Sequence, residues 1–240
     1  MNHDLASSLE FFVLLARHRN LSTVARQLDL TPPAATKRLL RINATLGFGR
    51  TAIAPIASEF ALHHPQVEVQ LDVTDRPIDL VEIGVDLGIR FGALPDQRLV
   101  ARRVLSNRRF LCAAPRYLAR HGTPASLRDL ADHQCIIHRQ NEDAYGVWRF
   151  TRDGRAETVK VHGALSSNDG DIVLNWALDG HGILVRSEWD LAKYLESGRL
   201  RVVLPEFILP SADLFVYYPS KRDLSARTRA FIDFLMARFA

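Results

Sequence analysis

The stretch TPPAATKRLLRINATLGFGR, residues 31–50, joins two kinds of predicted structure with nothing between them. Thr31 is a residue type that caps helices, and the two prolines after it fit a first helical turn, where a missing N–H costs little. Apolar residues continue the helical spacing as far as Leu39 and Leu40. From residue 40, however, LRINAT is an apolar run typical of a buried strand, and LGFGR follows as a glycine-containing loop. The stretch therefore predicts a helix that runs directly into a strand.

Two shorter helical patterns precede this stretch. Apolar residues recur at helical spacing over residues 5–18, and Ser22 then caps a short helix that ends at the sequence DLT. A tight turn joins that helix to the one beginning at Thr31, which is the pattern of a helix-turn-helix. We therefore expect residues 1–39 to form a small all-α unit. The alternative is a purely structural role, in which the helix at 31–40 only packs against residues 1–30.

The composition is that of a globular protein with an uneven charge distribution. The 240 residues are 47% hydrophobic and 24% charged, with a formal net charge of +4, which favours a packed core over disorder. Residues 1–38 hold five Arg or Lys against three Asp or Glu, and such a basic segment permits a nucleic-acid partner. The sequence shows neither an apolar run of about 18 residues nor the layout of a signal peptide. We therefore expect a cytoplasmic protein without a membrane span.

Residues 40–240 alternate strand and helix patterns, which favours an α/β fold with a mostly parallel sheet in each of two lobes. We expect strands at LRINAT, VEVQLDV, VDLGIRFG, LVARRVL, RRFLCAAP, QCIIHR, VWRF, ETVKVHG, the start of ALSSNDGDIVLNWALDG, GILV, LRVVLP and DLFVYYP. We expect helices at 51–64, from Pro77 to Gly84, at PRYLARHG and SLRDLADH, from Asp169, from Ser187 to Gly198 through a Ser187–Asp190 capping box, and from Ser225. The turn at Asp153-Gly154 joins two of these strands as a hairpin.

The sequence resembles a known family at this point. FF…NLSTVARQLDLTPPAATKRL resembles the helix-turn-helix of LysR-type transcriptional regulators. Residues 40–240 resemble the effector-binding domain of the same family in the phrases GFGR, RPIDLVEIGVDLGIRFG, RRFLCAAPRYLARHGTP, LSSNDGD and LSARTRAFIDFL. The phrases NRRFLCAAPRYLARHGTP and LSSNDGD are similar to those of regulators of organic-acid utilisation, the D-malate type among them.

The resemblance implies a type II periplasmic-binding-protein fold, in which the chain crosses twice between two lobes. The crossings are expected near Phe110–Ala114 and Leu214–Tyr218. Lobe I is then about 40–111 and 215–240, and lobe II about 112–214.

The sequence departs from the family pattern at Leu40-Arg41. In the family, a winged hairpin and a long linker helix follow the recognition helix, and the linker helix pairs two DNA-binding heads. Both elements are missing here. Because a helix of about 20 residues spans about 30 Å, its loss removes the separation and pairing of the heads. The chain resembles a regulator with an internal deletion.

Recognition helices place their N-terminal side chains over base edges, while basic and hydroxyl groups hold phosphates. Lys37 is suited to a phosphate, Thr36 and Arg38 to hydrogen bonds, and the apolar members to a thymine methyl. The expected partner is double-stranded DNA. The predicted DNA contacts are Thr31, Pro32, Pro33, Ala35, Thr36, Lys37 and Arg38.

Two polar corners predict a small-molecule site between the lobes. Ligands of open α/β sheets sit beyond the C-terminal ends of strands, where helix N-termini favour anions. The predicted effector contacts are Thr45 and Leu46 after the first strand, Ser167 and Asn168 before a helix, Arg90 at the end of LGIR, and His181 between two glycines. The natural ligand of such a cleft is a carboxylate. Alternatively, Thr45, Ser167 and Asn168 only cap helices.

Other patterns carry less information about chemistry. HQCIIH brings His133, Cys135 and His138 close in sequence, but alternation on a strand puts Cys135 and His138 on opposite faces, so no metal site is predicted. GFGR lacks the third glycine and the Lys-Ser/Thr tail of phosphate-binding loops. We expect no cofactor.

The sequence thus predicts a homo-oligomeric transcription factor that responds to a small anionic metabolite. The main alternative is a ligand-binding sensor that has lost DNA binding through the internal deletion. An enzyme on the same two-lobed fold is the third possibility, although no local pattern indicates catalysis.

Overall fold

The computed structural model describes residues 39–76, 79–92, 94, 96–139, 145–220 and 224–239. The expected helix-turn-helix and all seven predicted DNA contacts within residues 31–38 lie outside this range. Leu39 and Leu40 lie inside it, and both belong to the first strand rather than to the helix expected from Thr31. Both side chains are buried in the sheet, so packing overrides their helical spacing.

Lobe I contains a five-stranded mixed sheet with the order β2-β1-β3-β12-β4. Strand β1 (Leu39–Ala44) runs parallel to β2 (Glu68–Val73) and β3 (Leu87–Phe91). Strand β12 (Leu214–Pro219) runs antiparallel to β3 and to β4 (Leu99–Leu105). Strands β1, β2, β3 and β4 therefore run in one direction, and within this sheet β12, which returns from the other lobe beside β4, runs against them. The prediction of a mostly parallel sheet is confirmed for this lobe, with one antiparallel strand.

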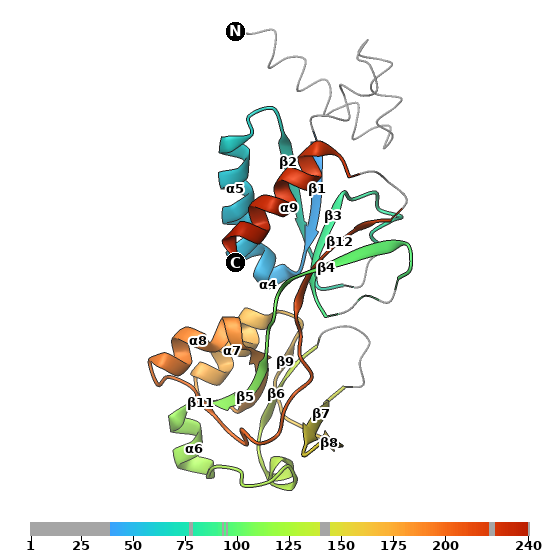
Figure 1. Cartoon of the computed structure of the whole chain (residues 1–240). Helices are drawn as coiled ribbons and strands as arrows, with labels where there is room; N and C mark the ends of the chain where they lie inside the picture. Colours follow the sequence, from blue (N-terminus) through green and yellow to red (C-terminus); the bar gives the residue numbers. More distant parts are fainter. Residues whose placement is uncertain are drawn as a thin grey trace.

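Helical segments cover one face of this sheet (Figure 1). A continuous helical stretch comprises α4 (Leu46–Phe48), a π-helical turn (Gly49–Ile53) and α5 (Ala54–His63). The expected glycine loop LGFGR is thus helical. A Cβ on Gly49 would lie 2.5 Å from Cγ1 of Val73, so glycine is what lets this helix approach the sheet closely.

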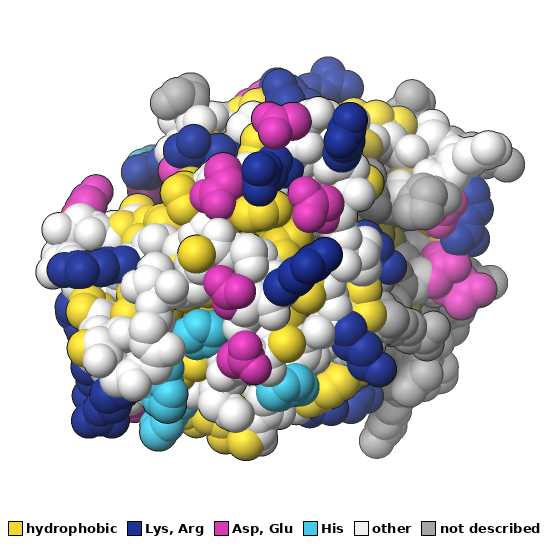
Figure 2. Space-filling model, turned by 90° about the horizontal axis from the view of Figure 1, so that it is seen from below, with side chains coloured by type: hydrophobic (Ala, Val, Ile, Leu, Met, Phe, Trp, Pro, Cys, Tyr) yellow, Lys and Arg dark blue, Asp and Glu magenta, His cyan; other side chains and the backbone are white. Residues whose placement is uncertain are grey.

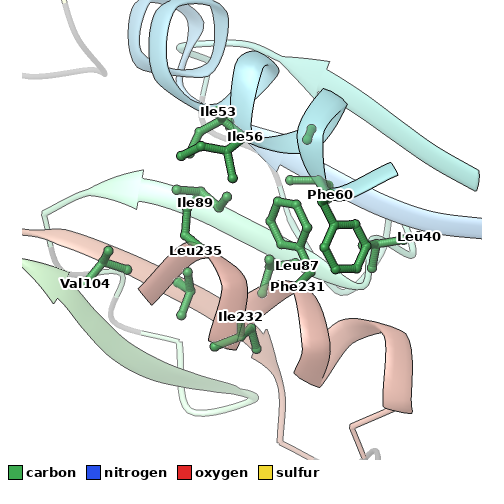
Figure 3. Close-up of a cluster of buried hydrophobic side chains, with 14 of the residues drawn as sticks. Leu40, Ile53, Ile56, Phe60, Leu87, Ile89, Val104, Phe231, Ile232 and Leu235 are labelled. Carbon is green, nitrogen blue, oxygen red and sulfur yellow. The ribbon is translucent and has the colours of Figure 1, made fainter. Parts of the chain in front are cut away.

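The core of lobe I lies between the sheet and the pair α5 and α9 (Ala226–Arg238) (Figure 3). The ring of Phe60 meets that of Phe231 edge-on at 5.1 Å. The apolar side chains that these helical segments turn towards the sheet are buried: Ile53, Ile56, Ala57, Phe60, Phe231, Ile232 and Leu235. Ser225 caps α9 by accepting a hydrogen bond from the Thr228 N–H, as its residue type predicts.

Lobe II contains a second mixed five-stranded sheet, β11-β5-β10-β6-β9. Strand β10 (Ile183–Ser187) pairs antiparallel with β5 (Arg109–Ala113) and parallel with β6 (Cys135–His138). The short strands β11 (Arg201–Val202) and β9 (Ser166–Ser167) form the two edges. Strands β11, β10, β6 and β9 run in one direction and β5 enters the sheet against them, so the mostly parallel arrangement is confirmed for this lobe too, with one antiparallel strand.

Four helical segments accompany the second sheet. They are α6 (Pro115–His121), a 3₁₀ helix (Arg128–Asp132) at the predicted SLRDLADH helix, α7 (Gly170–Leu178) and α8 (Glu188–Glu196). Within the described ranges, no helix is long and apolar enough to cross a membrane. Seen from the lobe II end of the molecule, acidic, basic, histidine and apolar side chains are interspersed (Figure 2).

A hairpin of β7 (Val147–Arg152) and β8 (Arg155–Lys160) lies beside the lobe II sheet (Figure 1). Its turn is the predicted Asp153-Gly154 pair, with φ angles of 49° and 74°. Such left-handed angles at both central residues suit the turn that matches strand twist in a hairpin. This prediction is confirmed.

Two predicted local features differ from the structure. The helix expected from Pro77 to Gly84 is a run of turns where it is described, between residues 80 and 84. Ser187 does occupy the N-cap of α8 but makes no side-chain cap, because its hydroxyl accepts a hydrogen bond from Asn107 Nδ2 at 3.0 Å. The predicted Ser187–Asp190 capping box is therefore wrong.

The chain crosses between the lobes at two adjacent places, each a few residues before the predicted position. Strand β5 pairs entirely within the second sheet and β12 entirely within the first. The crossings are therefore residues 106–108 and 210–213, rather than Phe110–Ala114 and Leu214–Tyr218. Apolar runs mark the strands themselves, and the crossings are the more polar residues just before them.

Phe60 provides a direct test of the lobe I core. Phe60→Ala should lower the free energy of unfolding by about 3–5 kcal/mol, because it removes a fully buried ring and leaves a cavity. Leu62→Ala, two residues along the same helix, is the control: Leu62 is 80% exposed, and a change of about 0.5 kcal/mol or less is expected. Urea denaturation measures both. Equal effects would contradict the assigned inner face of α5.

Candidate functional site

A cavity of about 240 Å³ lies between the two lobes. Lobe I contributes the residues at the start of the α4 helix and the end of β3, and lobe II contributes the ends of β6 and β10 with the first turns of α7 and α8. The lining residues are Thr45, Gly47, Phe48, Asp75, Phe91, Arg109, Ile136, Ile137, His138, Arg139, Tyr145, Gly146, Val147, Trp148, Gly170, Val185, Arg186, Ser187, Trp189, Asp190 and Ala212.

Thr45 presents an unused polar group at this cavity. It occupies the N-cap of α4, but its side chain makes no capping hydrogen bond. Its Oγ1 is buried and has no hydrogen-bond partner, although Thr45 lines the cavity. A buried hydroxyl without a partner costs about 1–3 kcal/mol, so the site is poised to gain from a ligand oxygen.

Arg186 supplies the buried positive charge of the cavity. Its side chain is 9% exposed, and its Nε lies 2.7 Å from Oδ2 of Asp190 in the first turn of α8. Its Nη1 donates to His138 Nδ1 at 3.1 Å. A Cβ on Gly170 would overlap the guanidinium, so the glycine there leaves room for it. The guanidinium is therefore held in one place between α7 and α8.

His138 positions Arg186 by staying neutral. Burial, and then the neighbouring Arg186 charge, lower the pKa of His138 from 6.5 to about 4. The neutral ring accepts from Arg186 at Nδ1, so the proton resides on Nε2, which donates to the Asn168 carbonyl oxygen at 3.3 Å. His138 thus links the arginine to the loop before α7.

Contacts beside the cavity join the two lobes. Arg50, at the start of the lobe I helix, pairs with Asp171 at 2.5 Å and with Asp169 at 3.6 Å in lobe II. The ring of Phe48 meets the Trp189 ring edge-on, with centroids 4.8 Å apart. The described conformation is therefore one in which the lobes touch across the cavity entrance.

The predicted effector residues are only partly brought together. Thr45 lines the cavity, whereas Leu46 does not, and its N–H donates to Asp75 Oδ1 at 2.8 Å. Arg90 is buried behind the cavity, where Nη1 donates to the Thr74 carbonyl at 2.9 Å and Nη2 to Asn43 Oδ1. Burial lowers the pKa of Arg90. Arg90 therefore supports the strand ends around the site and does not face it.

The second predicted corner also lies outside the lining. Ser167 is buried, and its Oγ accepts from the Asp169 N–H at 3.0 Å. Asn168 is exposed and reaches the site only through its carbonyl, which holds His138. His181 is exposed, with its N–H bonded to the Trp176 carbonyl. Helix α7 is capped instead by Asp169, which accepts from two backbone N–H groups.

Sequence reasoning missed Arg186, His138 and Asp190. The signal that could have found two of them is position, since His138 and Arg186 end or nearly end the parallel strands β6 and β10. The carboxyl ends of such strands are where ligands bind. Asp190 was assigned instead to a capping box.

The neutral state of His138 predicts a pH-dependent stability. The pKa of His138 is lower in the folded state than in the unfolded state. The contribution of neutral His138 to the free energy of unfolding is therefore present above pH 6.5 and is lost as the pH falls towards 4. Between pH 7 and pH 5 this loss amounts to about 2 kcal/mol. His138→Gln keeps an acceptor and a donor without titrating. Its free energy of unfolding, measured by urea denaturation, should therefore fall by about 2 kcal/mol less than that of the wild type between pH 7 and pH 5. His63→Gln, an exposed histidine of α5, is the control. An equal fall in the free energy of unfolding of wild type and His138→Gln between pH 7 and pH 5 would show that His138 is not held neutral.

Two family matches together cover most of the chain. Residues 34–240 match the LysR substrate binding domain, and residues 6–49 match the bacterial regulatory helix-turn-helix protein of the lysR family. The two matches overlap over 34–49, so no residues separate them.

Individual relatives agree with these matches. The HTH-type transcriptional activator TtdR of Escherichia coli (strain UTI89 / UPEC) is 39% identical over 225 residues, covering 93% of this chain and 71% of TtdR. The probable HTH-type transcriptional regulator LtrA of Klebsiella pneumoniae is 27% identical over 294 residues, covering 98% of this chain and 95% of LtrA. Since this chain has 240 residues, LtrA contains positions that it lacks. The regulatory domain of CrgA, a LysR-type transcriptional regulator from Neisseria meningitidis, has a TM-score of 0.73 and 28% identity, covering 85% of this chain and 100% of that domain. The chain belongs to the LysR family of bacterial transcription regulators.

Proposed function

We propose that the cavity between the lobes binds a small carboxylate as the effector of this regulator. The observation that carries the proposal is the presence, in one cavity, of the buried Arg186 guanidinium and the unpartnered hydroxyl of Thr45. Arginine pairs with carboxylates through strong charge-assisted hydrogen bonds. The LysR family consists of regulators, so the bound acid acts as a signal rather than as a substrate.

The size of the cavity supports a small ligand. Sites for drug-sized molecules occupy roughly 300–1,000 Å³, and this cavity measures about 240 Å³. Arg109 and Arg139 also line it, and Arg109 Nε donates to the Pro210 carbonyl at 2.9 Å. The arginines supply charge, and Trp148 and Phe91 supply apolar wall. An organic acid of a few carbon atoms matches this combination.

The response follows from where the ligand would sit. A molecule that contacts Thr45 in lobe I and Arg186 in lobe II favours the arrangement in which the lobes are closed, and it shifts the population towards that arrangement. Because β1 begins at Leu39, lobe I directly follows the helix-turn-helix region in sequence. A change in lobe arrangement is thereby coupled to the DNA-binding segment. We further propose that the chain acts in the cytoplasm as a homo-oligomer.

Titration with matched ligands tests the effector proposal. Isothermal calorimetry on the full chain should show saturable binding of a four-carbon dicarboxylate and none of the corresponding diamide, because only the acid pairs with arginine. Binding of the diamide with the same affinity as the acid would contradict the effector proposal. So would a failure to bind the dicarboxylate and every other acid of three to six carbons.

Thr45→Val gives opposite effects on binding and on stability. The substitution keeps the shape but removes the unpartnered hydroxyl, so carboxylate affinity should fall about tenfold while the free energy of unfolding stays equal or rises by about 1 kcal/mol. Calorimetry and urea denaturation measure the two changes. Thr51→Val is the control, because the Thr51 hydroxyl is exposed and bonds the Gly47 carbonyl. A loss of stability without a change in affinity would place the Thr45 hydroxyl outside the ligand site.

The missing linker helix favours a second candidate function, that of a sensor which no longer binds DNA. Fluorescence anisotropy with DNA from the gene's own upstream region, over a salt series and against scrambled DNA, separates the two candidates. A working regulator should prefer its own DNA over scrambled DNA at moderate salt. The residues proposed to contact that DNA are Thr31, Pro32, Pro33, Ala35, Thr36, Lys37 and Arg38. Equal and salt-labile binding of both DNAs would favour the sensor, because purely electrostatic contacts weaken steeply with salt.

A further inference from the structure

The cavity contains a carboxylate of its own. Asp190 lines it from α8, its side chain is 13% exposed, and Oδ2 lies 2.7 Å from Arg186 Nε. The Arg186 guanidinium also gives Nη1 to His138. Nη1 is thus hydrogen-bonded within the protein, while Nε is in ion-pair contact with Asp190 without a hydrogen bond. A ligand carboxylate that approaches Arg186 therefore meets a second negative charge already in place.

The charged residues that line the cavity affect how much negative charge a bound ligand can carry. Among the described lining residues, the cations are Arg109, Arg139 and Arg186, and the anions are Asp75 and Asp190, while His138 is neutral at pH 7. At Arg186 the Asp190 carboxylate already lies against the guanidinium, so each carboxylate of a ligand adds negative charge beside an existing one. A dianion brings one negative charge more than a monoanion into this partly buried site, where repulsion from Asp190 is only weakly screened by solvent.

We propose that Asp190 sets the charge selectivity of the cavity, acting as a built-in carboxylate that disfavours dianionic effectors relative to monoanionic ones. The inference rests on the proposed binding of a carboxylate and adds to it the residue that discriminates between acids. Asp190 is suited to this role because it is held against Arg186, whereas Asp75 is engaged by the Leu46 N–H on the opposite lobe.

Protonation of Asp190 provides a route by which a dianion still binds. Burial raises the pKa of Asp190; the Arg186 charge opposes this, Asp171 of α7 adds to it, and Lys193 of α8 opposes it. A second ligand carboxylate adds one more nearby negative charge and raises that pKa further. Binding of a dianion is therefore coupled to proton uptake to a greater extent than binding of a monoanion.

The test compares butanedioate with its half-amide, which have the same length and differ by one charge. In Asp190→Asn the ratio of dianion affinity to monoanion affinity should rise about tenfold over wild type, because the competing charge is gone while an oxygen remains for Arg186. Asp179→Asn, an exposed carboxylate at the far end of α7 paired with Arg116, is the control for net charge and should leave the ratio unchanged.

A second measurement on the wild type keeps the inference testable if Asp190→Asn does not fold. Calorimetry in two buffers of different ionisation enthalpy should show more protons taken up with butanedioate than with the half-amide. An unchanged affinity ratio in Asp190→Asn, or equal proton uptake for the two ligands, would overturn the role of Asp190 while leaving carboxylate binding intact. Failure of wild type to bind either compound or any related acid would instead overturn the proposed function itself.

Discussion

The two-lobed arrangement depends on the hydrogen bonds that Asn107 makes where the chain crosses between the sheets. Its backbone N–H donates to Asp213 Oδ1 at 3.0 Å, and its carbonyl accepts from the Ala212 N–H at 3.0 Å. Its side-chain Nδ2 donates to the Ala212 carbonyl at 2.9 Å and to Ser187 Oγ at 3.0 Å. Asn107 is 2% exposed, so these bonds form without competition from solvent. One buried residue therefore ties the outgoing crossing to the returning one.

A cavity beside such a junction is suited to signalling. Because both crossings lie together, a small rotation about them moves one lobe against the other without breaking either sheet. The lobe contacts that oppose opening, Arg50 with Asp171 and Phe48 with Trp189, flank the cavity. The Arg50 pair is half exposed, so it contributes at most about 1 kcal/mol and does not lock the lobes. A ligand that bridges Thr45 and Arg186 then has enough binding energy to change the balance.

The sequence predicted most strands and helices, the two lobes and one cavity residue, Thr45. These succeed because they depend on local periodicity and on the position after a strand. The antiparallel pairing of β12 was missed because it depends on the direction from which the chain returns. Arg90 and Arg186 both lie at or near the end of a strand, and only packing distinguishes them. Arg90 donates hydrogen bonds to Asn43 and to the Thr74 carbonyl, whereas Arg186 lies in the space beside Gly170.

The most direct measurement of the central claim is a crystal structure of the chain with a four-carbon carboxylate bound. We expect one carboxylate group between the Thr45 hydroxyl and the Arg186 guanidinium, with His138 and Asp190 still in contact with that guanidinium. Density for the acid beside Arg90 or His181 would contradict it, as would a saturated complex in which the cavity between the lobes is empty.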